Sequence, residues 1–546
     1  MPAGTDEYGT TAEVKALAEN CTPKELCDRY FAVHADIYRW FNISCDIFGR
    51  TTHELHSQIT QDVFLKLKTN DFLEERWTNQ LYCQQHHAFL ADRFVEGECA
   101  TCGYPDARGD QCDGCGKILD TLDLKNPRCK VDGSTPIVRE TKHMFLRLDK
   151  LQPEIDAFYR QSAVKGAWSE NGKRITEAWL KEGLIPRSIT RDLKWGIAVP
   201  IPQYEDKVIY SWFDACIGYV SITAQYTPEW RRWWHSPDDV QLYQFLGKDN
   251  VSYHSVIFPG SQLGSRDDWT KLHHLSSTEY LTYEGGKFSK SRGVGVFGDT
   301  AKNTGIPADI WRFYLLSHRP ESGDSEFNWD ALISGNNNLL LKNLGNFINR
   351  VLKFLNGPHY EAIVPDYNSY GEASLDILEE DINNLLAQYI QELDAVKLRA
   401  ALNTILRISQ RGNVFLQSEG LDNKLAASQP LKCAAIIGRA VNLAHLIAAL
   451  LAPYMPDTAQ SIQAQLKTEP GLIPEVWNTN AISPGHTVGP AALLFQRLDP
   501  AKASEWRVSF GEKGLKKVVA KNGGRRKAGR GETTEDTHPP EVNLLG

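Results

Sequence analysis

The chain has 546 residues, which is too long for one hydrophobic core, so we expect two to four domains. Hydrophobic residues make up 42% and charged residues 23% of the chain, as in ordinary soluble globular proteins. The formal net charge of −8 excludes a uniformly basic nucleic-acid coat, although it leaves room for a local basic groove. The first residues, M-P-A-G-T-D-E-Y-G, contain no apolar signal core, and the eleven cysteines are an odd number. These features predict an intracellular protein with reduced thiols.

The first half of the chain changes character twice. Residues 11–95 have the amphipathic periodicity of helices, whereas residues 97–135 are dominated by glycine, cysteine, aspartate and proline. Residues 205–257 alternate short strand-like runs, such as K-V-I-Y-S-W-F, with helix-like runs. This alternation is typical of an α/β domain.

Long helical patterns fill residues 336–445 and predict an all-helical module. The most apolar segment, residues 440–455, is too short for a membrane span and carries Asn442 and His445, so we expect a buried helix and no membrane partner. From residue 511 the chain turns basic and then acidic, which predicts a disordered tail over residues 511–546.

Two C-x-x-C pairs, separated by nine residues, predict a zinc knuckle. Each pair turns two thiolates toward one centre, and Gly103 and Gly116 follow the pairs, where a knuckle turn needs a residue that tolerates positive φ. The alternative is four free cysteines that are close only by chance. Four sulfur ligands leave no open position, so the predicted zinc is structural. The ligands are Cys99, Cys102, Cys112 and Cys115. Cys129, in C-K-V-D-G, resembles half of a second knuckle without partners, so no second metal is expected.

The stretch E-G-G-K-F-S-K-S-R-G-V-G-V-F-G-D, residues 284–299, combines basic and hydroxyl side chains with five glycines. One interpretation is a solvated surface loop, which most such runs are. The other is a mobile loop that closes over a polyphosphate, because glycines permit movement and lysines neutralise phosphate charge. Composition alone does not decide between them.

Several motifs in order resemble methionyl-tRNA synthetases. They are K-F-S-K-S at 287–291, which is similar to the K-M-S-K-S loop of class I synthetases, together with G-T-D-E-Y-G-T near the start, the zinc knuckle, I-T-R-D-L-K-W-G at 189–196, S-W-F-D-A-C-I-G-Y at 211–219, F-L-G-K-D-N-V-S-Y-H at 245–254 and L-G-N-F-I-N-R at 344–350. The resemblance covers roughly residues 4–510. The K-F-S-K-S form and L-D-N at 421–423 are similar to the eukaryotic cytosolic, particularly fungal, branch.

The resemblance implies an α/β fold with a Rossmann-type parallel sheet, followed by an all-α anticodon-binding bundle. The predicted segments are a first catalytic half (1–75), a connective insertion with the knuckle (76–190), a second catalytic half (191–265), a K-F-S-K-S and stem-contact region (266–332), an anticodon-binding domain (333–510) and the tail (511–546). The resemblance also implies a cytoplasmic methionine–tRNA ligase. Such an enzyme uses ATP with Mg²⁺ and structural Zn²⁺ and binds L-methionine and tRNA(Met). Other synthetases or scaffold proteins are candidate partners.

The activation chemistry implied by the family is an in-line attack of the methionine carboxylate on the α-phosphorus of ATP, which depends on positioning and charge neutralisation. The residues that match catalytic positions are Lys287, Lys290 and Arg191. Those that match ATP-binding positions are Gly247, Asp249, Lys287, Ser289, Lys290 and Ser291. Taken alone, Asp249 would be read as a helix N-cap, and Arg191 equally well as half of a structural salt bridge.

Five residues match the family's methionine pocket: Asp6, Trp212, Ala215, Tyr219 and His254. Asp6 matches the carboxylate that holds the α-ammonium group, and aromatic faces suit a thioether. Without the resemblance, the aromatic residues would be read as plain core. Cys216 stands where bacterial relatives have proline, so its part in side-chain selection stays open.

Asn346 and Arg350 match anticodon-contacting positions, and their spacing of four residues places them on one helix face. Amide and guanidinium groups suit the edges of unstacked bases, and Asn423 is a further candidate. The alternative is an ordinary polar surface. The basic residues at 513–530 are equally consistent with non-specific RNA affinity and with an inert, solubilising end.

The sequence contains no H-x-G-H element, which precedes the G-T-D-E-Y-G stretch in the family. The first β–α–β unit of the nucleotide-binding fold is therefore expected to be absent, and with it one helix N-terminus for the ATP phosphates. An alternative function follows, namely a catalytically impaired, truncated synthetase-like protein that binds tRNA. A synthetase for cysteine, leucine or valine is disfavoured by the complete methionine-type set.

Overall fold

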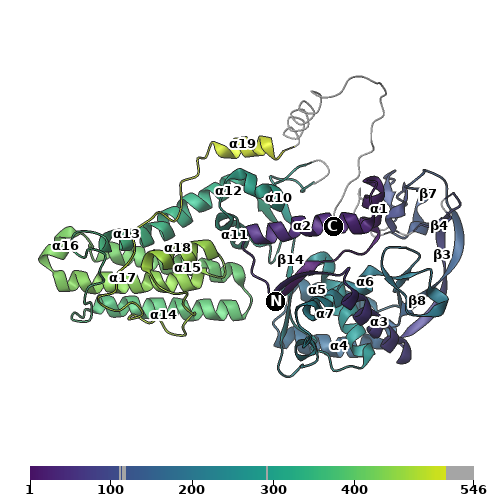
Figure 1. Ribbon diagram of the computed structural model, residues 1–546, viewed down its shortest axis with the longest axis horizontal. Coiled ribbons are helices and arrows are strands. Elements are labelled where there is room, and N and C mark those ends of the chain that lie inside the picture. The colour runs from purple at the N-terminus through teal and green to yellow at the C-terminus, as the bar shows by residue number, and fades with distance from the viewer. Residues whose placement is uncertain (86, 91, 110–111, 113–118, 290–292, 512–546) are drawn as a thin grey trace, which may run out of the picture. The chain divides into compact units, whose positions relative to one another are not determined.

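The computed structural model describes residues 1–85, 87–90, 92–109, 112, 119–289 and 293–511 (Figure 1). These residues divide into two compact units. The first contains Met1–Ile37 and Ser44–Glu279, and the second contains Tyr38–Ile43 and the chain from Tyr280 onward. The finer division into six segments stays a prediction.

The first unit contains two pairs of parallel strands. Strand β1 (Pro2–Thr5) pairs with β2 (Ile47–Arg50), and β13 (Leu242–Gly247) pairs with β14 (Leu272–Thr278). Among the described residues, each of these strands has one partner. The predicted parallel arrangement is therefore present as two separate pairs rather than as one continuous sheet.

Helices pack against these strands around one apolar core. Helix α3 (Glu54–Thr69) contacts α7 (Ile217–Tyr226) and α9 (Phe258–Ser265), and α7 also covers β1 and β2. A Cβ at Gly4 would lie 2.3 Å from the carbonyl oxygen of Gly49, so glycine is required for the close approach of β1 and β2 under α7. The other helical segments of this unit are α1 (Thr10–Ala18), α2 (Pro23–Trp40, which ends in the second unit), α4 (Leu148–Lys165), α5 (Glu170–Glu182), α6 (Ser211–Asp214), α8 (Arg231–Trp234) and the π-helix η5 (Tyr253–Ile257).

An antiparallel insertion interrupts the first unit. Strand β3 (Leu73–Cys83) pairs over ten residues with β8 (Ile137–Leu146), so the helical expectation for residues 11–95 is wrong from Leu73 onward. Polar side chains lie on both faces of the strand, and it therefore lacks the apolar alternation that reveals a half-buried strand. Shorter strands complete the insertion and its surroundings: β4 (Ala88–Phe89), β5 (Val95–Glu98), β6 (Ala107–Arg108), β7 (Lys125–Cys129), β9 (Arg187–Ser188), β10 (Thr190–Arg191), β11 (Ile197–Ala198) and β12 (Val208–Ile209).

The second unit is mainly helical, as predicted. It begins with the parallel pair β15 (Leu281–Tyr283) and β16 (Ser325–Phe327). Its helices are α10 (Gly298–Ala301), α11 (Ala308–Ser317), α12 (Trp329–Ser334), the π-helix η7 (Gly335–Gly345), α13 (Asn346–Leu355), α14 (Ala373–Asp394), α15 (Leu398–Ser418), α16 (Asn423–Ser428), α17 (Pro430–Leu451), α18 (Pro456–Leu466) and α19 (Lys502–Ser509).

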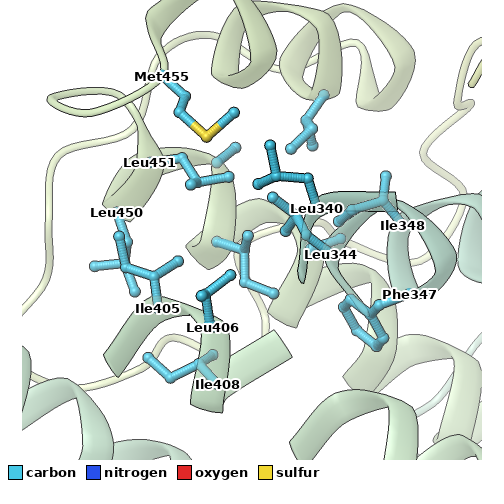
Figure 2. Close-up of a cluster of buried hydrophobic side chains, with 14 of the residues drawn as sticks. Leu340, Leu344, Phe347, Ile348, Ile405, Leu406, Ile408, Leu450, Leu451 and Met455 are labelled. Atoms are coloured by element: carbon cyan, nitrogen blue, oxygen red, sulfur yellow. The ribbon is translucent and has the colours of Figure 1, made fainter. Parts of the chain in front are cut away.

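Helix α17 lies at the centre of this bundle. Figure 2 shows buried side chains from η7, α13, α15 and α17 meeting in one apolar cluster, among them Leu340, Leu344, Phe347, Ile348, Ile405, Leu406, Ile408, Leu450, Leu451 and Met455. Within the described chain, α17 alone has the length and composition of a membrane span, but 89% of its most apolar window is buried inside the protein. The helix therefore serves as the core of the bundle, as the sequence predicted.

Replacing Asn442 with leucine is expected to lower the free energy of unfolding by about 2 kcal/mol. The buried Asn442 amide donates to the carbonyl of Gly438 (2.8 Å) and accepts from the backbone N–H of Ile482 (2.7 Å), which leucine would leave unpaired. Urea unfolding followed by circular dichroism measures the change. The matched control is Asn368→Leu at an exposed loop position, and equal stability of the two variants would contradict the expectation.

Candidate active site

Three of the predicted site residues in the first unit lie where parallel strands end. Asp6 directly follows β1, and Gly247 and Asp249 lie at and just beyond the end of β13. Asp249 lies inside the short 3₁₀ segment Lys248–Asn250, whose N-cap is Gly247, so the N-cap interpretation of Asp249 is wrong. Ligands of open α/β sheets bind outside the carboxyl ends of the strands. The fold therefore places these three residues at the carboxyl ends of strands in two separate parallel pairs, which are positions where a ligand is expected.

The Asp6 carboxyl group has a strongly altered acidity. Its side chain is accessible to solvent, but it lies so closely among protein atoms that desolvation, assisted by the charge of Asp214, raises its pKa from 3.8 to about 7. The Tyr8 backbone N–H and the Thr51 hydroxyl act in the opposite direction. A cationic group bound next to Asp6 would favour the carboxylate form.

A buried hydrogen-bond chain joins His56, Asp214 and Ser221. Nε2 of His56 lies 3.0 Å from Oδ2 of Asp214, and Nδ1 lies 2.9 Å from Oγ of Ser221. Burial lowers the pKa of His56 to about 4 and raises that of Asp214 well above its usual value. Burial thus shifts the pKa of each group in the direction that favours its uncharged form. Sequence analysis missed this pair, although Asp214 stands inside the S-W-F-D motif.

His254 and Tyr219 form a direct pair. Nδ1 of His254 lies 2.8 Å from the carbonyl oxygen of Asn250, which can only accept, so we assign the proton to Nδ1. Nε2 then accepts the Tyr219 hydroxyl at 3.0 Å. Burial lowers the pKa of His254, which keeps the ring neutral and this pairing intact. The structure thus joins two of the predicted methionine-pocket residues.

The other predicted pocket residues lie on or next to the short helix α6. Ala215 ends α6, and Trp212, which is 40% exposed, packs its ring 5.2 Å from that of Tyr253. Cys216 is buried, and desolvation raises the pKa of its thiol. An accessible indole beside buried, uncharged neighbours suits an apolar ligand group.

Arg191 lies over the ring of Tyr210, 3.6 Å from its centroid, and donates to the Ser188 hydroxyl and the Thr190 carbonyl. Asp192 instead pairs with His143 at 3.0 Å and with Lys207. Among the described residues, the structural salt bridge therefore belongs to Asp192 and not to Arg191.

The K-F-S-K-S loop lies in the second unit. Lys287 is exposed, and the backbone groups of Ser289 and Val294 exchange two hydrogen bonds of 2.8 Å. Phe288 packs on Tyr283, and a Cβ at Gly295 would lie 2.2 Å from the Phe288 ring. The described residues on either side of the loop thus pair as a hairpin, and Lys287 just before it is exposed to solvent. Lys290 and Ser291 lie outside the described residues.

Three of the four predicted zinc ligands converge. The sulfur atoms of Cys99, Cys102 and Cys112 lie within 4.8 Å of one another, and those of Cys102 and Cys112 are 3.6 Å apart. Tetrahedral zinc with Zn–S bonds of about 2.3 Å separates its sulfurs by about 3.8 Å, so the set fits the metal. The Cys102 backbone N–H lowers the pKa of Cys99 to about 6, which favours the thiolate. Cys115 lies outside the described residues.

A second set of donors was not anticipated. Cys83, Cys129 and Asp132 also place their ligand atoms within 4.8 Å of one another. The turn after Cys129 repeats the knuckle geometry, because Gly133 donates to the Cys129 carbonyl at 2.8 Å, as Gly103 does to Cys99 at 2.9 Å. Desolvation raises the pKa of the Cys129 thiol to about 11, so this set holds less thiolate than the first. The sequence did not reveal it because Cys83 lies far upstream on β3.

In the helical unit, Asn346 is exposed and donates to Asn413 on α15 at 2.8 Å, while Arg350 is partly buried one turn further along α13. Asn423 is exposed at the start of α16, which Asp422 caps. Two further exposed residues precede Asn346 in four-residue steps, namely Asn338 and Lys342, whose side chains are 3.1 Å apart. Sequence analysis missed these two, although the regular spacing N-x-x-x-K-x-x-x-N-x-x-x-R is visible in it.

Residues 1–352 match the family model described as "tRNA synthetases class I (M)". Together with acidic residues at parallel-strand ends and the lysine-bearing hairpin, this match defines the class of the protein as a class I aminoacyl-tRNA synthetase. Residues 364–514 match the model described as "Anticodon binding domain of methionyl tRNA ligase". The chain therefore belongs to the methionyl-tRNA synthetase family, as the motifs predicted.

Curated relatives agree with this assignment. The chain is 52% identical over 516 residues to the probable cytoplasmic methionine–tRNA ligase of Schizosaccharomyces pombe, covering 94% of this chain and 66% of that protein. It is 50% identical to the cytoplasmic enzyme of Saccharomyces cerevisiae, covering 93% of this chain and 67% of that protein. The chain thus spans about two thirds of the length of these relatives.

A solved structure supports the fold. Mycobacterium tuberculosis methionyl-tRNA synthetase bound by methionyl-adenylate matches with a TM-score of 0.72 at 20% identity, covering 91% of this chain and 92% of that one. The predicted fold class, an α/β catalytic unit followed by a helical anticodon-binding unit, is confirmed.

Proposed function

We propose that this chain is a cytoplasmic methionine–tRNA ligase, which activates methionine with ATP and transfers it to tRNA(Met). The observation that carries the proposal is the placement of Asp6 and the Tyr219–His254 pair in one unit with the ATP-type residues at strand ends. The names of the fungal relatives and the methionyl-adenylate bound in the Mycobacterium structure support the same reaction.

In the first step, an oxygen of the methionine carboxylate attacks the α-phosphorus of ATP, and pyrophosphate leaves. Asp6 would hold the methionine α-ammonium group, which orients the carboxylate toward phosphorus. Because the bound cation favours the ionised acid, binding would overcome the desolvation that raises the Asp6 pKa. Asp6 thus positions the nucleophile and takes no proton from it.

The methionine side chain would lie against Trp212, Ala215, Tyr219 and His254. His254 is neutral and already accepts a hydrogen bond from the Tyr219 hydroxyl, so it presents no full charge to the methionine sulfur. The same hydrogen bond holds the phenol ring of Tyr219 in a fixed orientation. Aromatic rings and a thioether attract one another by about 0.3–1.5 kcal/mol per contact. Selection would therefore depend on shape and polarisable surfaces.

ATP would bind along the end of β13, with the carboxylate of Asp249 accepting from the ribose hydroxyls and Gly247 allowing close approach. Mg²⁺ would accompany the phosphates, although no residue of this chain is assigned to it. Lys287 and Lys290, assisted by Ser289, Ser291 and Arg191, would neutralise the charge that develops on the departing pyrophosphate.

For transfer, the chain must recognise tRNA. Asn346 and Arg350, extended by Asn338 and Lys342, form a row of amide and basic groups on the η7–α13 surface, and Asn423 offers another amide. Such groups bind the edges of unstacked anticodon bases. Charging of tRNA(Met) with methionine tests the function, and tRNA(Met) with an altered anticodon should be charged at least tenfold more slowly. Equal charging of both RNAs would contradict anticodon recognition.

A second candidate is a tRNA-binding protein without synthetase activity, favoured by the lack of an H-x-G-H sequence in the 546 residues. Retention of tRNA(Met) by a folded chain that forms no adenylate would support it. Larger assemblies with other synthetases or scaffold proteins stay a prediction.

The knuckle leads to a prediction about metal content. We expect about one zinc ion per chain by atomic-emission analysis, held by Cys99, Cys102, Cys112 and Cys115. Cys112→Ser should release most of it, whereas Cys45→Ser, outside both donor sets, should retain it. Two zinc ions per chain would contradict the expectation of a single metal and point to Cys83, Cys129 and Asp132.

A further inference from the structure

Helix α19, the last helix of the described chain, binds the first residue of the K-F-S-K-S loop region. Nε of Arg507 donates to Oε2 of Glu284 at 2.9 Å, and the other end of the guanidinium bonds to Asp330. These three residues all belong to the second unit. The Arg507–Glu284 bond spans 223 residues of sequence, so nothing in the local sequence of the loop reveals it.

The other end of the loop is bound by the same segment. The backbone N–H of Gly295 donates to the carbonyl of Phe510, immediately after α19, at 2.9 Å. Gly295 has φ of +120°, a conformation that favours glycine. The α19 segment therefore contacts the loop at both ends, Glu284 and Gly295, and leaves Lys287 between them.

A buried tryptophan connects these contacts. Trp329 is fully buried, and its ring lies 4.9 Å from Trp506 and 5.7 Å from Phe510. Its backbone N–H donates to Oε1 of Glu284 at 2.8 Å. Both carboxylate oxygens of Glu284 are thus bound, one by the Trp329 backbone and one by Arg507. This arrangement fixes the orientation of the Glu284 side chain.

Glu284 has an unfavourable backbone conformation, so the contacts that hold its side chain matter for the loop. Its φ is +45°, a left-handed conformation that is unfavourable for a non-glycine residue. Tyr283 and Gly286 exchange backbone hydrogen bonds of 2.8 and 2.9 Å around Glu284, and Lys287 directly follows Gly286. Phe288, the next residue, packs against Tyr283. A change at Glu284 is therefore passed along the chain to Lys287.

We propose that α19 braces the phosphate-binding loop, and that Arg507 is a positioning residue acting through Glu284 on Lys287. The catalytic part of this inference rests on the proposed function, whereas the mechanical part does not. A purely structural α19 would support the helical unit as a whole and would have no particular effect on residues 285–295.

Hydrogen exchange of the full chain tests the mechanical part. Arg507→Ala should raise the exchange rates of the Ser289 and Val294 amides about tenfold, because a charge-assisted hydrogen bond at the base of the hairpin is lost. Arg507→Lys keeps the charge, so its exchange rates at these amides should lie between those of the unmodified chain and those of Arg507→Ala. The matched control is Lys502→Ala on the same helix, where an exposed lysine pairs with Glu505 alone among the described residues, and exchange in the loop should not change.

Two outcomes would overturn the brace. One is loop exchange equal to that of the unmodified chain in Arg507→Ala, and the other is a uniform rise that includes the buried amides of α17. If Arg507→Ala does not fold, Glu284→Gln removes the same ion pair with little change in volume and is judged by the same two outcomes.

The catalytic part is measured by ATP–pyrophosphate exchange. Arg507→Ala should lower kcat about tenfold and leave the methionine KM unchanged, because the predicted methionine contacts lie in the first unit. A raised methionine KM with unchanged kcat would contradict a role through Lys287. If the unmodified chain shows no exchange reaction, the proposed function fails, and the hydrogen-exchange result still decides the brace.

Discussion

Replacing Asp6 with asparagine should weaken methionine binding at least 100-fold at pH 8, while the protein remains folded. The variant keeps the size of the side chain but removes the charge that pairs with the α-ammonium group, and loss of a desolvated charge partner costs about 2–5 kcal/mol. Isothermal titration with methionine measures the change. The control is Asp238→Asn, an exposed acid in a loop of the same unit, which should bind methionine as the unmodified chain does.

The same carboxyl group predicts a pH dependence. With a pKa of about 7, Asp6 is about one-tenth ionised at pH 6 and nine-tenths ionised at pH 8, so methionine should bind about tenfold more weakly at pH 6. The acid keeps its proton in the folded state between about pH 4 and 7, where the unfolded chain has lost it. Its contribution to stability therefore falls as pH rises through this range, and Asp6→Asn should be at least as stable as the unmodified chain at pH 8. A pH-independent methionine affinity, or strong destabilisation by the substitution, would contradict this role.

The second large effect is expected at the loop. Lys287→Ala should lower methionine-dependent ATP–pyrophosphate exchange about 100-fold, because one preorganised charge at developing negative charge is worth about that factor. The methionine KM should change less than twofold, since the predicted methionine contacts lie in the other unit. Lys353→Ala, at an exposed position on α13, is the control for loss of a surface lysine. A change confined to the methionine KM would show that the role of Lys287 is misassigned.

Short motifs predicted much of this protein because they are local. Two C-x-x-C pairs at close spacing favour a knuckle, and three of the four cysteines converge as expected. The helical unit was also predicted correctly, because α17 and its neighbours have long apolar patterns typical of helices. The family match then confirmed what the ordered motifs predicted.

The features that were missed depend on contacts between distant residues. Strand β3 carries polar residues on both faces and is defined by its pairing with β8, so periodicity pointed to the wrong structure. His56 and Asp214 are 158 residues apart, and neither is distinctive alone. The same holds for Cys83 with Cys129, and for Arg507 with Glu284. Such pairs are created by tertiary packing and leave no local pattern in the sequence.

The most direct test of the proposed function is ATP–pyrophosphate exchange by the purified, zinc-containing chain, with each of the twenty amino acids in turn. We expect exchange with methionine and none above background with cysteine, leucine or valine, the amino acids of the disfavoured alternatives. A folded chain that retains tRNA(Met) but shows no methionine-dependent exchange would contradict the ligase assignment and would establish the tRNA-binding alternative instead.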